Sequence, residues 1–351
     1  DSLVIGDFCK EYAIDEDDIN VSHVRNNLLI VLYEQTATQI NLFSLNNSVF
    51  QISEYIKVSP SNAEAAQVVG IRGLLDENLL TRDLPAGLEG EGEIVGVADT
   101  GLSTGDPLTI NPAFCDPTFS DKVIAAFPLN DWGDFHSHGT HVAGTICGTG
   151  VGYSGGSLRY KGMAPKSKLV IQNWGSYWDH YNWTTCIDLF DEAYQFGVRI
   201  HNNSTGEDNF YGEYSEFSNT ADWWTWNQKD MSIVKAAGNE RSYNDPFKVS
   251  LGNRSASKNL IVVGATENDK NDPQHPCNPT TIASFSSRGP CHDGRIKPDV
   301  VAPGDWLVSA KITNGYTNED PNYYNWRGTS MAAPVVTGSL ALIREYYRKI
   351  E

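Results

Sequence analysis

Five short apolar runs, separated by stretches with helical spacing, restrict the fold of this chain more than any other feature of its sequence. Between the second and third runs, Ile187, Phe190 and Tyr194 are spaced as one face of a helix over residues 184–196, which Gly197 would end. Apolar strands that alternate with helices predict an α/β fold, in which helices cover both faces of a mostly parallel sheet. A functional site is then expected beyond the carboxyl ends of the strands. The runs occupy residues 93–98, 168–172, 198–202, 232–237 and 260–264.

The first 60 residues have a different sequence pattern from the rest of the chain. Apolar runs at residues 28–32, 40–43 and 49–56 predict short strands in a small N-terminal segment, and Ser-Pro-Ser-Asn at residues 59–62 indicates a linker. The sequence therefore predicts an N-terminal region, residues 1–60, followed by a larger domain, residues 61–351.

The charge balance excludes one class of partner. The formal net charge is −18, from 26 Lys and Arg against 44 Asp and Glu, and this charge would repel a nucleic acid backbone. No apolar run reaches the length of about 18 residues that a membrane span needs. The carboxylates allow structural calcium, but a solvated acidic surface explains them more simply, and the metal ligands remain unknown.

The six cysteines leave the disulfide pattern open. Six cysteines allow fifteen complete pairings. Cys277 and Cys291 flank a loop-like stretch and can pair or stay free, whereas Cys147 lies in a small-residue apolar run and is predicted to be a core thiol.

Two segments place candidate chemical groups near the strand ends. Asp99 follows the first strand run, where an Asx turn alone would also explain it. Residues 134–144 hold three histidines, and Ser137 is predicted to cap a helix that begins near His138. Metal binding would favour the H-E-x-x-H pattern, which is absent. A general base is the better interpretation of one histidine, provided that an Asp and a nucleophile exist elsewhere.

Two further segments supply a hydroxyl and an amide. Gly328 permits a sharp turn before Ser330, which falls at a helix N-terminus and is either an N-cap or an exposed nucleophile. Pro334 is predicted in the first turn of that helix. Asn239 follows the fourth strand run and offers an amide donor. The buried stripe of the helix is predicted at Val336, Leu340 and Ile343.

Together these segments resemble the subtilisin-like serine peptidases, the subtilase family. The resemblance rests on residues 97–101, 137–144, 162–165, 236–239, 263–266 and 328–334, in the order of the family. Residues 284–290 and 293–304 resemble the oxidation-resistant alkaline subtilases that carry a C-terminal β-sandwich. The chain departs from the family pattern at His201, where the family has an apolar residue.

The resemblance implies a three-layer subtilisin-like fold and a serine endopeptidase that acts on polypeptides. It implies Ser330 as the nucleophile, His138 as the general base and acid, and Asp99 as the group that orients the imidazole. Asn239 and the Ser330 N–H would form the oxyanion hole. His141 would then be a packing residue.

The family also implies how substrate would bind. The resemblance places the substrate backbone against Ser204, Thr205 and Gly206, and against Ala237 and Gly238. No cofactor is expected for catalysis.

The resemblance gives two interpretations of residues 1–60. They resemble the end of a subtilase pro-segment, which would be an intramolecular inhibitor, or else form an attached accessory domain. The expected location is extracellular or in the secretory pathway.

Two other functions remain open at this stage. A transpeptidase or macrocyclase would pass the acyl group to an amine instead of water. A catalytically silent binding module would keep the fold without the chemistry, although such relatives usually lack a triad residue and this sequence has all three.

Overall fold

The computed structural model divides the chain into two units. They comprise Asp1–Lys57 and Val58–Glu351. In the first unit, β1 (Ile19–Val24) pairs antiparallel with β2 (Asn27–Leu32). β2 confirms the predicted strand at residues 28–32, and those at 40–43 and 49–56 lie outside the described residues. The described residues are 19–24, 27–32, 62–71, 87–114, 122–128, 131–150, 160–174, 186–205, 212–241, 249–268, 278–312 and 322–350.

A parallel sheet organises the described part of the second unit. Its seven strands lie in the order β4-β5-β3-β6-β7-β8-β9, and every neighbouring pair is parallel. All five predicted apolar runs form strands of this sheet, which confirms the predicted α/β class. The strands are β3 (Ile94–Asp99), β4 (Val123–Phe127), β5 (Lys168–Asn173), β6 (Ile200–Asn203), β7 (Ser232–Ala236), β8 (Ile261–Glu267) and β9 (Val300–Asp305).

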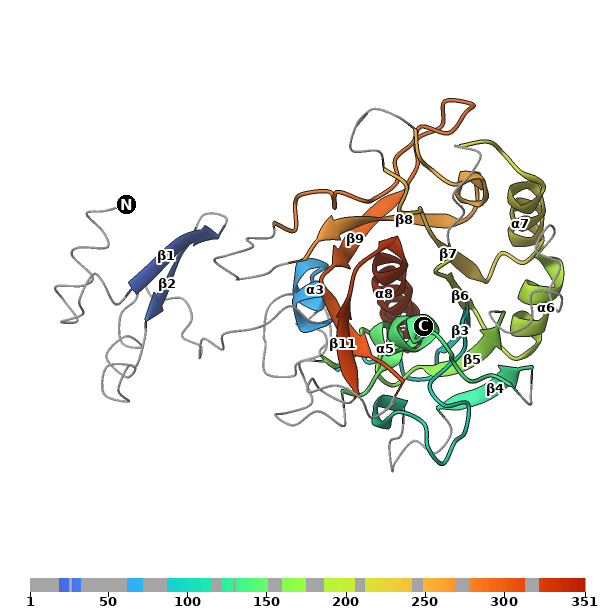
Figure 1. Ribbon diagram of the computed structural model, residues 1–351, viewed down its shortest axis with the longest axis horizontal. Helices are drawn as coiled ribbons and strands as arrows, with labels where there is room; N and C mark the ends of the chain where they lie inside the picture. Colours follow the sequence, from blue (N-terminus) through green and yellow to red (C-terminus); the bar gives the residue numbers. More distant parts are fainter. Residues whose placement is uncertain are drawn as a thin grey trace. The chain divides into compact units, whose positions relative to one another are not determined.

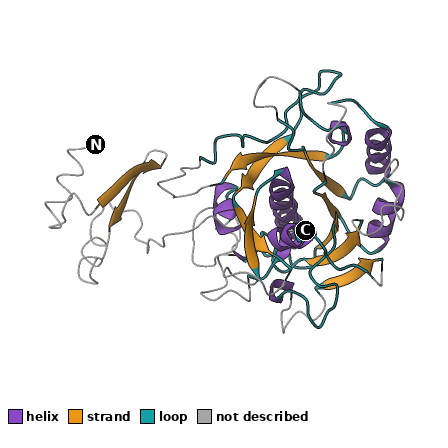
Figure 2. Ribbon diagram, in the orientation of Figure 1, coloured by secondary structure: helices purple, strands orange, loops and turns teal. Residues whose placement is uncertain are grey.

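Helices cover both faces of the sheet, as Figures 1 and 2 show. One face packs on α5 (His138–Cys147) and α8 (Thr329–Ile350), and the other on α6 (Ile187–Gln195) and α7 (Glu216–Asn227). Successive residues of a strand point to opposite faces, so that Val97 joins the α5–α8 core while Ala98 joins the α6–α7 core. This alternation explains why strands such as β3 have buried residues on both faces.

Shorter elements complete the described part of the second unit. They are α3 (Asn62–Val68), two 3₁₀ turns (Pro112–Phe114 and Asn253–Ala256), and a hairpin of β10 (Leu307–Ala310) and β11 (Tyr323–Trp326).

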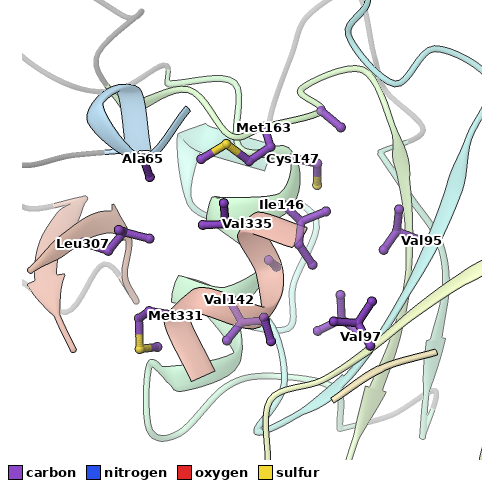
Figure 3. Packing of buried hydrophobic residues seen from close by; sticks show 14 of the residues in the cluster. Ala65, Val95, Val97, Val142, Ile146, Cys147, Met163, Leu307, Met331 and Val335 are labelled. Carbon is purple, nitrogen blue, oxygen red and sulfur yellow. The ribbon is translucent and has the colours of Figure 1, made fainter. Parts of the chain in front are cut away.

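The helix α8 lies in the middle of the domain and packs on α5, β8 and β9 (Figure 1). Figure 3 shows Val142 and Ile146 of α5 against Met331 and Val335 of α8, with Val97 of β3 beside them. Burial of each such side chain stabilises the fold by roughly 1.5–3 kcal/mol.

The predicted buried stripe of α8 is wrong. Ile343 is 50% exposed, and Val336 and Leu340 are only partly buried. The residues that face the core repeat at intervals of four and three instead, and at Gly338 a Cβ atom would lie 2.5 Å from the Cβ of Met163. This face of the helix is therefore in close contact with the segment between α5 and β5. It comprises Met331, Val335, Gly338, Leu342 and Glu345.

A buried carboxylate fixes the far end of α8. Glu345 is fully buried, and its Oε2 accepts hydrogen bonds from the backbone N–H groups of Glu89 (2.8 Å) and Gly90 (2.6 Å). Arg344 Nε donates to Glu93 at 2.9 Å. These contacts hold the C-terminal part of α8 against the segment that leads into β3, and so fix the position of the helix along its axis relative to the sheet.

Three of the cysteines fall in the described residues, and all three are buried free thiols. Cys147 confirms the predicted core thiol, and Cys186 precedes α6. Cys291 is free, so that it forms no disulfide with Cys277.

Candidate active site

Three adjacent strands of the sheet carry candidate groups at the same edge. Asp99 is the last residue of β3, Ser204 follows β6, and Asn239 lies three residues beyond the end of β7. The order β3-β6-β7 is parallel, so that these carboxyl ends lie side by side. The chain leaves β3 toward β4 and β5 and later returns to β6, which makes β3 the point where the strand order reverses. Such a point is where α/β sheets bind ligands.

Asp99 and His138 form a close hydrogen-bonded pair. The Asp99 Oδ1 lies 2.6 Å from the His138 Nδ1 and also accepts the Thr100 N–H at 2.8 Å. The Asp99 side chain is 1% exposed, whereas that of His138 is 18% exposed. Because an ionised carboxylate only accepts, Nδ1 carries the proton and the neutral ring has its lone pair on Nε2. The imidazole is therefore prepared to accept a proton at Nε2.

Asp134 builds the turn that presents His138. Its Oδ1 accepts from the Thr100 hydroxyl (2.8 Å) and the backbone N–H groups of His136 (2.8 Å) and Ser137 (2.9 Å), and its Oδ2 accepts from the Thr140 N–H (2.8 Å) and hydroxyl (2.6 Å). The prediction that Ser137 caps α5 is wrong, since Ser137 has φ of 70° and makes no capping bond with its side chain. A buried carboxylate satisfies more donors at the helix start than one hydroxyl can.

These charges change the proton affinity of the imidazole. Burial lowers the pKa of His138, but the charge and hydrogen bond of Asp99, with the charge of Asp134, outweigh burial, and the pKa is raised above its ordinary value. Burial lowers the pKa of His141 to about 3, so that His141 is neutral. His141 is fully buried and lies 3.1 Å from the Leu307 carbonyl through Nε2, which agrees with its predicted packing role.

Trp326 of β11 lies against the histidines. Its ring centroid is 5.4 Å from that of His138, in an edge-to-face arrangement, and 5.7 Å from that of the exposed His136. Its other neighbours include His141 at 6.0 Å. The indole therefore packs against the imidazole of His138 and restricts its rotation.

Ser330 and Ser204 are joined by two reciprocal hydrogen bonds. The Ser330 hydroxyl donates to the Ser204 carbonyl at 2.8 Å, and the Ser204 hydroxyl donates to the Ser330 carbonyl at 3.0 Å. The second bond has a covalent cause. Pro334 lies inside α8 and has no N–H to donate to the carbonyl four residues earlier, which is that of Ser330. In this structure the Ser330 hydroxyl is thus bonded to Ser204 and not to His138.

Asn239 is fixed against the start of α8. Its Oδ1 accepts the Thr329 N–H at 2.8 Å and the Thr329 hydroxyl at 3.2 Å. This orientation leaves the Nδ2 hydrogens available at an exposed position. Gly328 has φ of 152°, and a Cβ there would lie 3.6 Å from both side-chain polar atoms of Asn239. The turn at Gly328 therefore brings the amide and the first turn of α8 together.

The predicted substrate-contacting residues lie on both sides of this edge. Ala237 and Gly238 are buried, and the Gly238 N–H donates to the Thr329 hydroxyl at 3.1 Å. Thr205 accepts hydrogen bonds from Lys235 Nζ through its carbonyl and, at 3.1 Å, through its hydroxyl. Gly206 lies outside the described residues.

The polar residue that departs from the family pattern is accommodated in a buried network. His201 Nδ1 lies 2.9 Å from Asn203 Nδ2, and His201 Nε2 lies 2.8 Å from the Oε1 of Gln172. Gln172 Nε2 in turn donates to Glu192 at 2.8 Å. Burial lowers the pKa of His201 to about 3. The imidazole is thus neutral and accepts from Asn203 while donating to Gln172, which fixes β6, the strand that Ser204 follows.

The described residues offer no metal centre or membrane helix. No group of three or more His, Cys, Asp or Glu side chains within them is arranged to hold a metal ion, so structural calcium stays a prediction. None of the helices in these ranges is long and apolar enough to cross a membrane.

Comparison with known proteins identifies the family. Residues 90–351 match the subtilase family, peptidase S8. This chain is a subtilase. The match covers the whole sheet and every residue of the site described above.

Individual relatives agree with this assignment. The major intracellular serine protease of Bacillus subtilis (strain 168) is 30% identical over 266 residues, which cover 74% of this chain and 70% of that protein. The serine protease/ABC transporter B family protein tagB of Dictyostelium discoideum is 27% identical in an alignment that covers 75% of this chain but only 18% of that protein. A psychrophilic protease of known structure has 26% identity and a TM-score of 0.54, over 84% of this chain and 87% of its own.

Two groups in this subtilase escaped the sequence analysis. Asp134 is four residues before His138, and an acidic residue just before a helix is a capping signal that the three histidines obscured. The hydrogen bond from the Ser204 hydroxyl to the Ser330 carbonyl was also missed. A proline in the first turn of a helix leaves no helix carbonyl without a donor, and Pro334 was predicted there. Because α8 begins at Thr329, Pro334 lies beyond the first turn and leaves the Ser330 carbonyl free to accept.

Proposed function

We propose that this subtilase is a serine endopeptidase that hydrolyses peptide bonds of polypeptides through an acyl-enzyme at Ser330. The observation that carries the proposal is the 2.6 Å contact between Asp99 and His138 at the same sheet edge as the Ser330 hydroxyl and the Asn239 amide. Family membership supports the reaction class.

The geometry suggests the following sequence of steps. The Ser330 hydroxyl leaves the Ser204 carbonyl, transfers its proton to His138 Nε2 and attacks the substrate carbonyl carbon. Asp99 stabilises the imidazolium that forms. The negative oxygen accepts from Asn239 Nδ2 and from the Ser330 N–H, which lies in the first helical turn, where N–H groups have no intrahelical acceptor.

The second half of the reaction uses the same groups in reverse. His138 returns the proton to the leaving amine, and the Ser330 ester remains. A water molecule then gives a proton to His138 and attacks the ester carbonyl, which releases the acid and restores Ser330. All of these groups belong to amino acids, and we propose that catalysis needs no cofactor.

Substrate would bind as an additional strand. We propose that the segment 204–206 pairs with the substrate backbone on one side and that Ala237 and Gly238 contact it on the other. The Lys235 ammonium supports this by binding both oxygens of Thr205 from a buried position. Binding through main-chain bonds gives affinity with little sequence selectivity.

Casein hydrolysis, with and without a serine-directed fluorophosphonate, tests the proposed function. The expected result is release of peptides that the fluorophosphonate abolishes. A silent binding module would release none. A transpeptidase would join an added amine to the acyl fragment in preference to water, and mass spectrometry of the products would reveal it.

Replacement of Asn239 by Ala is expected to lower kcat by about 10²–10³, a factor taken from subtilisin itself, with a much smaller change in KM. The Nδ2 group would donate a hydrogen bond to the negative charge that develops on the carbonyl oxygen. Loss of this donor therefore raises the energy of the transition state more than that of the bound substrate. Steady-state kinetics on a fluorogenic peptide would measure the effect. An unchanged kcat would remove Asn239 from the oxyanion hole.

The acid limb of the kcat/KM profile is expected to have its midpoint above the 6.5 of an unperturbed imidazole. His138 accepts a proton only when neutral, and its raised pKa keeps it protonated to higher pH, so activity rises as the pH increases through that value. The profile of Asp134→Asn, which removes one of the charges that raise the pKa, should move to lower pH. A wild-type midpoint at or below 6.5 would contradict this assignment.

We propose that residues 1–60 are a pro-segment that the enzyme removes. Incubation of the full chain with calcium is expected to give a species that begins between residues 56 and 70, whereas Ser330→Ala stays full length. Intact mass and N-terminal sequencing would measure this. Wild-type protein that keeps Asp1 and is fully active on casein would instead show an accessory domain.

Two further assignments rest on sequence resemblance. Residues 284–290 and 293–304 support the oxidation-resistant alkaline subgroup. Extracellular or secretory-pathway location stays a prediction, since the Bacillus subtilis relative is named as intracellular.

A further inference from the structure

The strand β6 differs from its neighbours in the sheet because three of its four residues are polar and buried. His201, Asn202 and Asn203 are at most 4% exposed. Successive side chains of a strand point to opposite faces. His201 and Asn203 bond to each other, and the His201 ring contacts Phe190 of α6, so that Asn202 points to the opposite face, toward α8. A buried amide costs stability unless it is hydrogen-bonded, and Asn202 finds its partners on that face.

The Asn202 side chain links two turns of α8 to the end of β6, on which that helix packs. Its Nδ2 donates to the Ser204 hydroxyl at 2.9 Å, and its Oδ1 accepts the Thr337 hydroxyl at 2.8 Å. The Ser204 hydroxyl in turn donates to the Ser330 carbonyl at 3.0 Å. Three hydrogen bonds therefore lead from Thr337, in the third turn of α8, through Asn202 and Ser204 and back to Ser330 in the first turn.

The chemistry of the groups fixes the direction of each bond. The Ser204 hydroxyl has one hydrogen, which it donates to the Ser330 carbonyl, so that it accepts from Asn202. Asn202 must then present its NH₂ group to Ser204 and its Oδ1 to Thr337. The Thr337 hydroxyl also lies 3.0 Å from the Ala333 carbonyl, but that carbonyl has a helical N–H donor as well. The Thr337 hydroxyl is thus the group that fixes the orientation of the Asn202 amide.

These bonds act on the residue that carries the proposed chemistry. Pro334 leaves the Ser330 carbonyl without an intrahelical donor, and the Ser204 hydroxyl takes that place. Ser204 is 2% exposed, and Asn202 and Thr337 are fully buried, so that a lost partner would leave a buried polar group unsatisfied. The position of the first turn of α8 relative to β6 therefore depends on this line of bonds. The hydroxyl and the backbone N–H of Ser330 both belong to that turn.

We propose that Asn202 and Thr337 are positioning residues that align Ser330 with the substrate carbonyl. The inference rests on the proposed function. Both side chains are fully buried and act through Ser204, which Asn202 aims at the Ser330 carbonyl while Thr337 holds Asn202 in place. A small displacement of a nucleophile slows the reaction strongly, so the loss of either side chain should change kcat much more than substrate binding.

The variant Thr337→Val is expected to lower kcat for a quenched peptide about tenfold, with KM within about twofold of the wild type, since a shift of a full ångström can cost about a hundredfold. Valine has the shape of threonine without the hydroxyl, so that the Asn202 Oδ1 loses its donor. Thr337→Ser keeps the hydroxyl and should keep nearly the full kcat. A packing role would give the reverse order, because valine fills the space of threonine and serine leaves a gap the size of a methyl group.

A double variant tests whether the two residues act through one route. Asn202→Ala removes both bonds of the amide and should lower kcat by about tenfold or more. Adding Thr337→Val to Asn202→Ala should lower kcat little further, because Thr337 acts on Ser330 only through Asn202. Two effects that multiply in full would show that the side chains act independently, which would overturn the proposal.

Thr145→Val is the matched control for the loss of a buried hydroxyl. Thr145 is also fully buried in a helix, α5, and its hydroxyl donates to the His141 carbonyl at 3.1 Å. None of the hydrogen bonds described for this side chain reaches β6. Thermal unfolding should show a similar loss of stability in Thr145→Val and Thr337→Val, with kcat unchanged in Thr145→Val. Wild-type kcat in Thr337→Val, or an equal loss of kcat in both variants, would contradict the proposed positioning.

Labelling of Ser330 by a fluorophosphonate distinguishes failure of this inference from failure of the proposed function. In this reaction the Ser330 Oγ bonds to phosphorus and fluoride leaves, so that no peptide needs to be cleaved. Intact mass should show labelling about tenfold slower in Thr337→Val and unchanged in Thr337→Ser. That result without peptide cleavage by the wild type would refute the endopeptidase and keep the positioning role. Cleavage with equal labelling rates would refute the positioning role alone, and a wild type that is neither labelled nor active would refute both.

Discussion

Replacement of Ser330 by Ala is expected to reduce the kcat for peptide hydrolysis by about 10⁶, the factor known for subtilisin. The hydroxyl is the only nucleophile that the proposed mechanism uses. Its described hydrogen bond is to the Ser204 carbonyl, so its loss should cost about 1 kcal/mol of folding free energy. Alanine is smaller than serine and favours a helix, so α8 is expected to form in the variant. Turnover of a quenched peptide and thermal unfolding would measure the two effects.

His138→Ala should match Ser330→Ala, because the members of a catalytic triad act as a unit. His136→Ala is the matched control, since His136 is exposed and lies outside the Asp99 pair. A harmless His138→Ala together with an inactive His136→Ala or His141→Ala would show that the wrong histidine has been assigned.

Asp99→Asn is expected to lower kcat by about 10⁴ and to leave the fold intact. The amide that replaces the carboxylate can present its NH₂ to His138 Nδ1, which forces the imidazole proton onto Nε2. Nε2 can then no longer accept the proton of Ser330. Asn is nearly isosteric with Asp, but the NH₂ that faces His138 Nδ1 then takes the place of Oδ1, which also accepts the Thr100 N–H, so that one backbone hydrogen bond is lost as well.

The same variant should also change the pH profile. Asp99 is the principal group that holds the pKa of His138 above its ordinary value against the effect of burial. Without that charge the remaining activity should keep its level to lower pH than in the wild type. An Asp99→Asn enzyme within tenfold of wild-type kcat would contradict the assigned tautomer.

Local sequence patterns predicted the five inner strands of the sheet. β3, β5, β6, β7 and β8 are buried on both faces, and all of them but β6 are centred on apolar residues. β6, Ile-His-Asn-Asn, was predicted from the run 198–202 although its buried residues after Ile200 are polar. β4 and β9 lie at the two edges of the sheet and were not predicted. Val300 and Val301 of β9 are 42% and 46% exposed, and this partial burial leaves a weaker pattern.

The parts of the site that sequence analysis missed depend on contacts between distant segments. Asp134 has its role partly because the Thr100 hydroxyl, which follows β3 and lies 34 positions away in the sequence, donates to it, and this partner is not visible in the local pattern. The stripe of α8 was misassigned for a similar reason. Its one charged member, Glu345, is buried only because the backbone at residues 89 and 90 turns toward it.

The central position of α8 has a consequence for the order of events during synthesis. The ribosome makes Asp99, His138 and Asn239 well before the 22 residues of α8, and α5, β6, β7, β8 and β9 all pack on that helix. A nascent chain that ends before α8 therefore has neither the nucleophile nor the element around which its sheet closes. Under the proposed mechanism, proteolytic competence is expected only once α8, which carries Ser330, has packed against these elements.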